Sequence, residues 1–307
     1  MADIAIIIGN GFDLDLGLPS KYSDFIESPE WKELARTLSN YPYEDYLNHS
    51  LINHLKKVWE KENWFDIEEA IHQFVMKHEK CNEEEIRDIK SEFNRLKKAL
   101  TNYLKRVSES FKADESKMAC QFLYNLVQCP HRMSEIYFNY TYPRLFLNGR
   151  TFYKPGYCTF TYVHGNLRDN DIVLGCDLQE GEKVNRDLSF MYKYNMLNKA
   201  NHVARSILEA KEIIFFGHSL NEMDFRYFKE FFKVASKAPE PTKHLTIITY
   251  DEESERNIKD NIQNQGISVT DLYSNLLSFD FIHTSKFYKG DKNEQELWKG
   301  MMLRLLS

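Results

Sequence analysis

The stretch that decides the fold lies near the start of the chain and reads Ile4-Ala5-Ile6-Ile7-Ile8-Gly9-Asn10-Gly11-Phe12-Asp13-Leu14-Asp15-Leu16-Gly17-Leu18-Pro19. Its apolar run, Ile4 to Ile8, is typical of a strand buried on both faces, as in a parallel sheet covered by helices. Gly9 and Gly11 then permit a turn in which the backbone comes close to a phosphate or to another element of the fold. Free amide groups in such a turn would suit an anion, so the stretch favours a nucleotide site.

The glycine pattern departs from the usual dinucleotide fingerprint. That fingerprint has a third glycine three residues after the second, and this chain has Leu14 there. What stands instead is Gly-x-Gly-x-Asp, with Gly17-Leu18-Pro19 eight residues after Gly9. Two interpretations therefore stay open on these residues alone: the glycines hold a phosphate, or they only shape a tight turn.

Composition and charge describe a globular protein. The chain has 307 residues, of which 42% are hydrophobic and 14% aromatic, enough for one large domain or two small ones. Its net charge of −6 argues against a general nucleic-acid binder and against binding to an anionic membrane surface. A nucleotide held in a local site remains compatible with that charge.

The five cysteines, Cys81, Cys120, Cys129, Cys158 and Cys176, show no short pair spacing. Neither a disulfide framework nor a zinc site is indicated, and no metal ligand is predicted. The first residues lack the basic region of a signal peptide, and no window approaches 18 apolar residues. We therefore expect a soluble, cytoplasmic protein.

A long helical block follows the first stretch. From Pro29 to Gln128 there is no glycine, and the only further proline is Pro42. Apolar residues recur at three- and four-residue spacing over Tyr46–Lys61, Ile67–Lys77 and Glu83–Phe111, which predicts helices there.

Short apolar runs that end in polar residues return after this block. They predict strands at Ile136–Phe138, Thr159–Val163, Ile172–Leu174, Glu212–Phe216 and Leu245–Ile248, and an edge strand at Phe279–Ile282. Helices are expected over Phe190–Leu208, Asp224–Ala235 and Glu294–Leu306. The predicted fold is α/β, a Rossmann-like, mostly parallel sheet formed by residues 1–28 and 129–307, with residues 29–128 as an inserted helical subdomain.

Polar residues lie where the expected strands end. The carboxyl ends of parallel strands meet at one edge of an open α/β sheet, so these residues should face one ligand crevice. The groups are Gly9-Asn10-Gly11-Phe12-Asp13, Phe138-Asn139-Tyr140-Thr141, Val163-His164-Gly165-Asn166, and Gly217-His218-Ser219-Leu220 followed by Asp224, while Asp251 follows a further strand.

In this arrangement the groups resemble the AbiH family of bacterial abortive-infection proteins and, more distantly, the sirtuin-like NAD-binding domains. The AbiH resemblance covers nearly the whole chain and includes Trp64-Phe65-Asp66-Ile67-Glu68, Leu174-Gly175 with Asp177, and Gly217 to Phe228. It implies a role in defence against phage.

The likeness to sirtuin-like domains implies a site for NAD. In those domains a glycine-rich first loop surrounds the phosphates, an asparagine lies near the nicotinamide ribose, and a His-Gly pair supplies the catalytic base. Asn139 and His164 take the last two positions and are the predicted catalytic residues. The predicted cofactor-binding residues are Gly9, Asn10, Gly11, Phe12, Asp13, Gly165, Gly217, Ser219 and Asp251.

The chain departs from the sirtuin-like pattern in two ways that bear on the reaction it could catalyse. The paired zinc cysteines of the protein deacylases are absent, which disfavours lysine deacylation. Asp13 occupies the place of a small hydroxyl residue, and its carboxylate would repel a pyrophosphate. We expect Asp13 to accept hydrogen bonds from ribose hydroxyls or backbone amides instead.

Other candidates have plainer interpretations. His218 is expected to be a loop residue rather than a second base, and Asn221 and Asp224 both suit a helix N-terminus. Asp66 and Glu68 lie two residues apart, on different faces of a helix, so capping is the simpler interpretation. The alternative is that the inserted helices fold over the cleft and one of these carboxylates completes it.

The sequence thus predicts an antiphage effector that binds NAD and hydrolyses it to nicotinamide and ADP-ribose, with a phage-derived or defence-system protein as a candidate trigger. The alternative is a nucleotide-sensing or scaffold protein of the same fold that binds without turnover. Nuclease action is disfavoured by the acidic balance and the lack of a carboxylate cluster for metal. No membrane or nucleic-acid partner is predicted.

Overall fold

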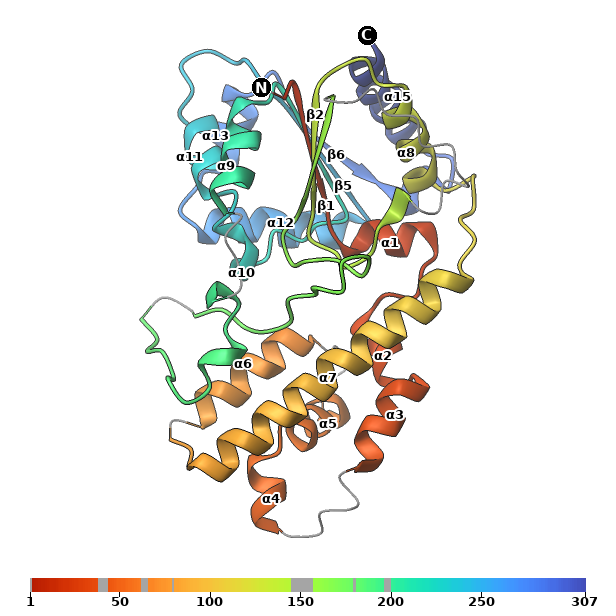
Figure 1. Cartoon of the computed structure of the whole chain (residues 1–307). Coiled ribbons are helices and arrows are strands. Elements are labelled where there is room, and N and C mark those ends of the chain that lie inside the picture. The colour runs from red at the N-terminus through yellow and green to blue at the C-terminus, as the bar shows by residue number, and fades with distance from the viewer. Residues whose placement is uncertain are drawn as a thin grey trace. The chain divides into compact units, whose positions relative to one another are not determined.

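The computed structural model describes residues 2–37, 44–61, 66–78, 80–144, 157–178, 181–195 and 200–307 (Figure 1). The chain divides into two compact units. The first, called the sheet unit, comprises residues 1–18, 111–163 and 199–307. The second, called the helical unit, comprises residues 19–110 and 164–198.

A parallel sheet forms the centre of the sheet unit. Among the described residues it has six strands, in the order β3-β2-β1-β4-β5-β6, and every neighbouring pair is parallel. The strands are β1 (Ile4–Ile8), β2 (Met133–Tyr137), β3 (Cys158–Tyr162), β4 (Glu212–Phe216), β5 (His244–Thr249) and β6 (Ser278–His283). This order is Rossmann-like and confirms the predicted fold class.

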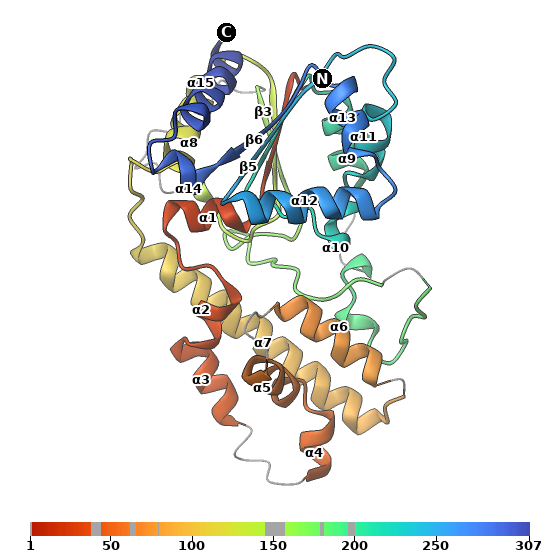
Figure 2. The same ribbon diagram turned by 180° about the vertical axis from the view of Figure 1, so that it is seen from behind.

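Helices cover both faces of the sheet (Figures 1 and 2). Helices α9, α11 and α13 lie against one face, and α8 and α15 against the other. The helices of this unit are α1 (Asn10–Leu16), α8 (Met118–Gln128), α9 (Ala200–Glu209), α10 (Glu222–Phe225), α11 (Lys229–Ala235), α12 (Glu252–Asn264), α13 (Val269–Asn275), α14 (Thr284–Phe287) and α15 (Lys292–Leu306).

Strand β1 is buried on both faces, as its isoleucines predict. Ala5 and Ile7 join a core cluster with residues of α9 and α11, including Val203 and Phe231. On the opposite face, the rings of Phe12, Phe122, Phe216 and Trp298 pack edge to face or tilted. Alternation of side chains along each strand supplies both cores.

The helical unit packs around its longest helix. It contains α2 (Tyr22–Ile26), α3 (Pro29–Arg36), α4 (Glu44–His49), α5 (Leu51–Lys61), α6 (Ile67–Lys77) and α7 (Glu83–Ser110), with 3₁₀ turns at Ser189–Met191 and Lys193–Asn195. Tyr103 of α7 packs against Phe25, and its hydroxyl donates to the Pro19 carbonyl at 2.7 Å. The buried carboxylate of Glu92 on α7 accepts from Ser50 Oγ and from the Ile52 amide, so it fixes the start of α5.

Several predicted elements are confirmed closely. The strands at Ile4–Ile8 and Glu212–Phe216 and the helix at Ile67–Lys77 match at both ends. Helix α7 ends one residue before the predicted Phe111, and β6 lies at an edge of the sheet as expected.

Four predicted elements were wrong in whole or in part. The helix expected over Tyr46–Lys61 is two helices, α4 and α5, with a break at Ser50. Ile172–Leu174 forms no strand; this apolar run is buried, and its Val173 amide donates to the His164 carbonyl at 2.7 Å. The helix expected from Phe190 begins, within the described residues, at Ala200, and Ser189–Met191 and Lys193–Asn195 form 3₁₀ turns instead. The helix expected over Asp224–Ala235 starts at Glu222 and is interrupted at residues 226–228.

The two units group some residues differently from the predicted domains. Helix α8 belongs to the sheet unit, whereas residues 164–198 cluster with the helices. Trp64 and Phe65 lie outside the described residues.

Candidate functional site

At the carboxyl edge of the sheet, the loops that follow β1 and β4 meet where the strand order reverses. We call the contact of Gly9, Gly11 and Gly217 there the glycine junction. The Gly9 amide donates to the Phe216 carbonyl at 3.0 Å, and the Gly11 amide donates to the Gly217 carbonyl at 2.9 Å. The Gly217 amide in turn donates to the Ile248 carbonyl at 2.9 Å. The loops after β1 and β4 are thus joined by backbone hydrogen bonds.

Close backbone packing explains the glycines at this junction. A Cβ on Gly9 would lie 2.5 Å from the Gly217 oxygen, and one on Gly11 would lie 2.7 Å from the Gly217 Cα. Gly217 has φ +65°, and its Cβ would lie 2.2 Å from the Phe12 nitrogen. The turn-shaping interpretation of Gly9 and Gly11 accounts for these contacts, and a phosphate-binding role for these residues stays a prediction.

A buried polar cluster joins α1 to the loop after β2. Asn139 Nδ2 donates to Asp13 Oδ1 at 3.0 Å and to Thr141 Oγ1 at 3.0 Å, and Thr141 Oγ1 donates to Asp13 Oδ2 at 2.6 Å. Asp13 is 0% exposed, Asn139 is 4% exposed and Thr141 is 1% exposed. We call them the Asp13 cluster. Asp13 binds side chains here, whereas the sequence predicted ribose hydroxyls or backbone amides as its partners.

Burial dominates the electrostatics of the Asp13 cluster. It raises the pKa of the Asp13 carboxyl from 3.8 to about 7, although the hydrogen bonds from Thr141 and Asn139 oppose the shift. The Asn139 carbonyl oxygen, Oδ1, is buried and has no hydrogen-bond partner among the described residues. An unsatisfied buried acceptor is costly, so this oxygen is suited to receive a donor from a ligand or a water.

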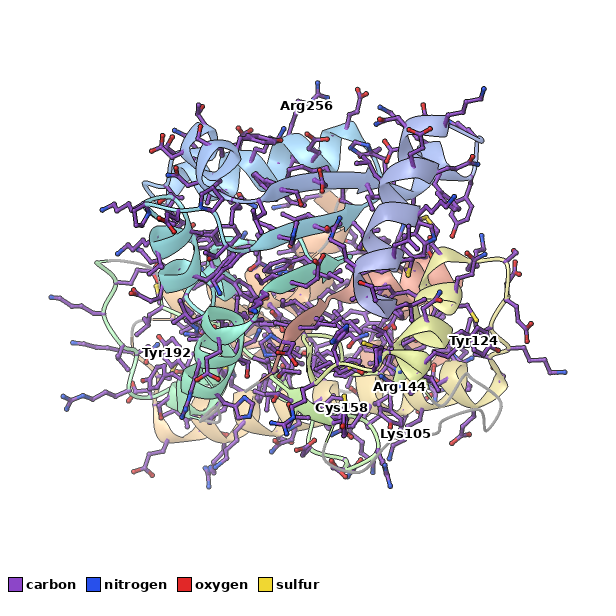
Figure 3. The ribbon with its side chains drawn as sticks, turned by 90° about the horizontal axis from the view of Figure 1, so that it is seen from above. Lys105, Tyr124, Arg144, Cys158, Tyr192 and Arg256 are labelled. Atoms are coloured by element: carbon purple, nitrogen blue, oxygen red, sulfur yellow. The ribbon has the colours of Figure 1, made fainter. Side chains whose placement is uncertain are left out.

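A buried ion pair holds Arg144, the last residue of the same loop described before residue 157. Arg144 Nε donates a hydrogen bond to Glu135 Oε2 at 2.8 Å, and Arg144 Nη2 donates one to Glu135 Oε1, so the pair is bidentate. Tyr137 Oη and Cys158 Sγ also donate to the Glu135 carboxylate. Arg144 and Cys158 are labelled in Figure 3. The sequence did not single out this pair, because strand alternation alone does not mark a glutamate as buried.

His218 is oriented by the loop that contains it. The Leu220 amide donates to His218 Nδ1 at 3.0 Å, and His218 Nε2 lies 3.8 Å from Asp224 Oδ2. Nδ1 therefore accepts, so in the neutral ring Nε2 carries the proton and faces Asp224. The ring packs edge to face on Phe138 and Phe228. Asn221, and not Asp224, caps α10: its side chain accepts from the Asp224 amide at 2.9 Å.

His164 lies two residues after the end of β3, at the first residue of a segment that belongs to the helical unit. Its side chain is buried. Gly165 has φ +70°, and a Cβ there would lie 2.1 Å from the Asp171 carbonyl oxygen, so the turn after His164 requires glycine. The Asn166 amide donates to Asp171 Oδ1 at 2.7 Å and completes this turn. Asn139, in contrast, belongs to the sheet unit.

Asp66 and Glu68 have distinct structural roles in the helical unit. Asp66 caps α6 by accepting from the Glu68 and Glu69 amides, which confirms the capping interpretation. Glu68 Oε2 lies 2.6 Å from Nζ of Lys193, whose side chain is fully buried. A second pair joins His72 Nε2 to Glu182 Oε2 at 2.8 Å. These pairs link residues 181–195 to α6, and Lys193 was missed because its partner lies far away in the sequence.

The remaining predicted site residues lie in varied surroundings. Asn10 and Ser219 are exposed, whereas the ring of Phe12 is fully buried, 4.7 Å from that of Phe216. Asp251 caps α12 by accepting from the Ser254 amide at 2.9 Å, and this bond lowers the pKa of its carboxyl.

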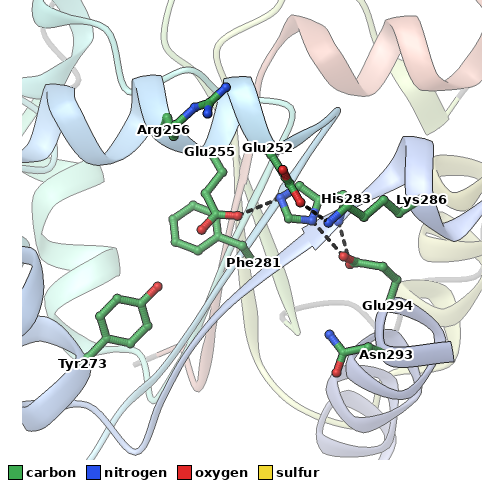
Figure 4. A pocket seen from close by; sticks show the side chains of 9 residues that line it. All are labelled: Glu252, Glu255, Arg256, Tyr273, Phe281, His283, Lys286, Asn293 and Glu294. Atoms are coloured by element: carbon green, nitrogen blue, oxygen red, sulfur yellow. Dashed lines mark hydrogen bonds and ion pairs between the residues drawn. The ribbon is translucent and has the colours of Figure 1, made fainter. Parts of the chain in front are cut away.

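A pocket of about 450 Å³ lies at the end of β6 (Figure 4). Its lining includes Glu252, Glu255, Arg256, His283, Lys286 and Glu294. His283 Nδ1 lies 2.7 Å from Glu294 Oε1, its Nε2 lies 2.7 Å from Glu255 Oε2, and Lys286 pairs with Glu252. The contacts of His283 link β6 to α12 and α15, and the pair of Lys286 with Glu252 links α14 to α12.

The part of the chain that the structure describes has neither a metal-binding cluster nor a membrane-spanning helix. Nowhere in that part of the chain do three or more His, Cys, Asp or Glu side chains gather so as to hold a metal ion. No helix within the described ranges is both long enough and apolar enough to cross a membrane.

Comparison with known proteins gives one family. The model of the family described as bacteriophage abortive infection AbiH matches residues 5–243, a span that holds the Asp13 cluster, His164 and His218 and ends just before β5. No curated protein and no solved structure gives a significant match. The pocket at the end of β6 lies beyond the matched span. Because the match extends over far more than half of the sequence, the chain belongs to the AbiH family of bacteriophage abortive infection proteins.

Proposed function

We propose that this AbiH defence protein acts on NAD and hydrolyses the bond between nicotinamide and ribose. Family membership supports the defence role. The observation that carries the chemical part is the buried Asn139 side chain, whose Oδ1 is without a hydrogen-bond partner among the described residues. It follows β2 at the carboxyl edge of a Rossmann-like sheet, where ligands of such folds bind.

The reaction needs few catalytic groups. Water attacks C1′ of the nicotinamide ribose, the N-glycosidic bond breaks, and its electron pair passes to the pyridinium ring, which leaves as neutral nicotinamide. No general acid is required for this leaving group. The enzyme must orient the substrate, stabilise an oxocarbenium-like ribose and accept a proton from water.

Asn139 and His164 are the residues proposed for those tasks. The Asn139 carbonyl oxygen would accept a hydrogen bond from a ribose hydroxyl or from the attacking water. His164 would take the proton, because a neutral imidazole has one ring nitrogen that can accept it. Gly165 would support this role because it permits the tight turn next to His164.

The glycine junction limits how NAD would bind. The Gly11 amide already donates to Gly217, and the Phe12 amide donates to the Gly9 carbonyl. Pyrophosphate binding would therefore rely on other groups than these two amides. The Asn139 site would be the part of the protein that holds the ribose.

Nicotinamide release from NAD by the purified full chain tests the proposal. Asn139→Ala and His164→Ala should abolish release and retain NAD binding, measured by calorimetry on each variant. His202→Ala, on the exposed face of α9, is a matched control for His164 and should release nicotinamide at the wild-type rate.

The other outcomes are equally informative. NAD binding without release, even with lysate from phage-infected cells added as a source of trigger, would favour the nucleotide-sensing alternative. Neither binding nor release would refute both interpretations and leave the glycines with their packing role alone.

A further inference from the structure

We propose that Asp13 and Thr141 are positioning residues that hold the Asn139 amide with its carbonyl oxygen presented to the ligand. The contact at Asn139 would then select a hydrogen-bond donor, a hydroxyl or a water, and would reject an acceptor such as a phosphate oxygen. This inference rests on the function proposed above and specifies the polarity of its central contact.

Hydrogen-bond counting fixes the orientation of the amide. An asparagine side chain has two N–H donors and one carbonyl acceptor. Both donors of Asn139 are used, one by Asp13 Oδ1 and one by Thr141 Oγ1. Thr141 can accept from Asn139 because its own hydroxyl proton goes to Asp13 Oδ2.

The reversed amide would be unfavourable. If the side chain flipped, Asn139 Oδ1 would face the Asp13 carboxylate, and two acceptors would meet in a fully buried site. With Asp13 ionised, the ring of three hydrogen bonds admits only the orientation observed. Asp13 and Thr141 therefore determine which atom of Asn139 is available.

The backbone around Asn139 is also held. The Phe138 amide donates to the Ile8 carbonyl at 2.8 Å, which extends the pairing of β1 and β2 up to Asn139. Further along, Arg144, the last residue described before residue 157, forms its bidentate pair with Glu135. With the backbone held at Phe138, the orientation of the Asn139 amide depends on its two side-chain partners.

The first test observes the amide itself and needs no activity. In ¹⁵N-labelled protein at pH 8, the two Asn139 side-chain protons, assigned by their loss in Asn139→Asp, should exchange with solvent at least about tenfold more slowly than those of the exposed Asn257. Thr141→Val should shift both resonances and speed their exchange, and Thr141→Ser should restore them. Exchange as fast as that of Asn257 in the wild type would overturn the inference.

The second test separates positioning from general stability. Thr141→Val should lower kcat for nicotinamide release roughly tenfold to a hundredfold and change KM for NAD less than about threefold. Thr141→Ser should recover most of kcat. Thr161→Val, the same change at a buried position on β3, is the control and should retain the wild-type kcat.

The two proposals fail in different ways. A slowly exchanging Asn139 amide in a protein that neither binds nor cleaves NAD would uphold the positioning role and refute the NAD function. Nicotinamide release that depends on Asn139 and is unchanged in Thr141→Val would uphold the function and overturn the positioning role.

Discussion

Asp13 Oδ1 accepts a hydrogen bond of 3.0 Å from Asn139 Nδ2, and the two residues are 126 positions apart in the sequence. The bond joins the first helix of the sheet unit to the loop after β2. Parallel pairing of β1 and β2 makes it possible, because it brings the carboxyl ends of the two strands side by side. The stability of the sheet unit is thereby linked to the protonation of one buried carboxyl.

The first prediction concerns the pH dependence of stability. The pKa of Asp13 is raised to about 7 in the folded state, so between about pH 4 and pH 7 the folded protein binds more protons than the unfolded chain. The contribution of Asp13 to the free energy of unfolding is thus greatest below pH 4 and is lost as the pH rises through 7. From pH 5 to pH 8 the loss should amount to about 3 kcal/mol.

Asp13→Asn should remove this part of the pH dependence. Urea unfolding of both proteins at pH 5 and pH 8 measures it, as the difference between their free energies of unfolding. An equal difference at the two pH values would contradict the raised pKa. Asp114→Asn, at an exposed carboxyl, supplies the control and should leave the wild-type pH dependence in place.

The second prediction concerns the glycine junction. Gly217→Ala should destabilise the protein by roughly 3 kcal/mol or more, because the new Cβ would meet the backbone of Phe12 and Gly11. Gly266 also has a positive φ, of +74°, but nothing lies within 4 Å of its added Cβ. Gly266→Ala should therefore cost only about 1 to 2 kcal/mol, from backbone strain. Equal costs in thermal unfolding would show that close packing does not explain Gly217.

A third prediction follows from the pair between Glu135 and Arg144. Arg144→Met removes the cation and leaves a buried carboxylate, which should lower the free energy of unfolding by about 3–5 kcal/mol. Glu135→Gln combined with Arg144→Met should recover part of that loss, since no buried charge then remains. Arg205→Met, at an exposed pair, should barely move the urea midpoint. A double variant no more stable than the single one would argue against the buried charge as the cause.

The fourth prediction addresses the helical unit. Lys193→Met removes the buried cation that pairs with Glu68 and should destabilise this unit by about 3 kcal/mol or more. Lys56→Met disrupts an exposed pair on α5 and should have little effect. Hydrogen exchange checks both variants: residues 181–195 should lose protection in Lys193→Met alone. Unchanged protection there would mean that apolar contacts suffice to hold the segment.

The agreement between sequence and structure is best where the deciding contacts are local. The isoleucine run of β1 is apolar without alternation, as a doubly covered strand must be, and α6 and α7 show the helical period over their whole length. Asp66 was identified as a cap because a cap binds amides only two or three residues away.

Prediction failed where an apolar run is buried without strand partners. Ile172 and Leu174 are as buried as strand residues, yet they form no ladder, and an apolar run of three cannot distinguish these cases. The 3₁₀ turns before α9 were also missed, since Tyr192 and Lys193 follow tertiary partners rather than a helical period.

The sequence by itself determined the class of the fold, the first strand and the main helices, because these depend on periodicity and on residues close together along the chain. It also indicated the family, through the resemblance of its motifs to AbiH proteins. Only the tertiary structure decided what its polar groups do. Parallel pairing brought Asp13 to Asn139 and Thr141, and close backbone packing gave Gly9 and Gly11 their partner in Gly217. Burial and hydrogen-bond polarity arise from contacts between distant segments, and no local pattern in the sequence encodes them.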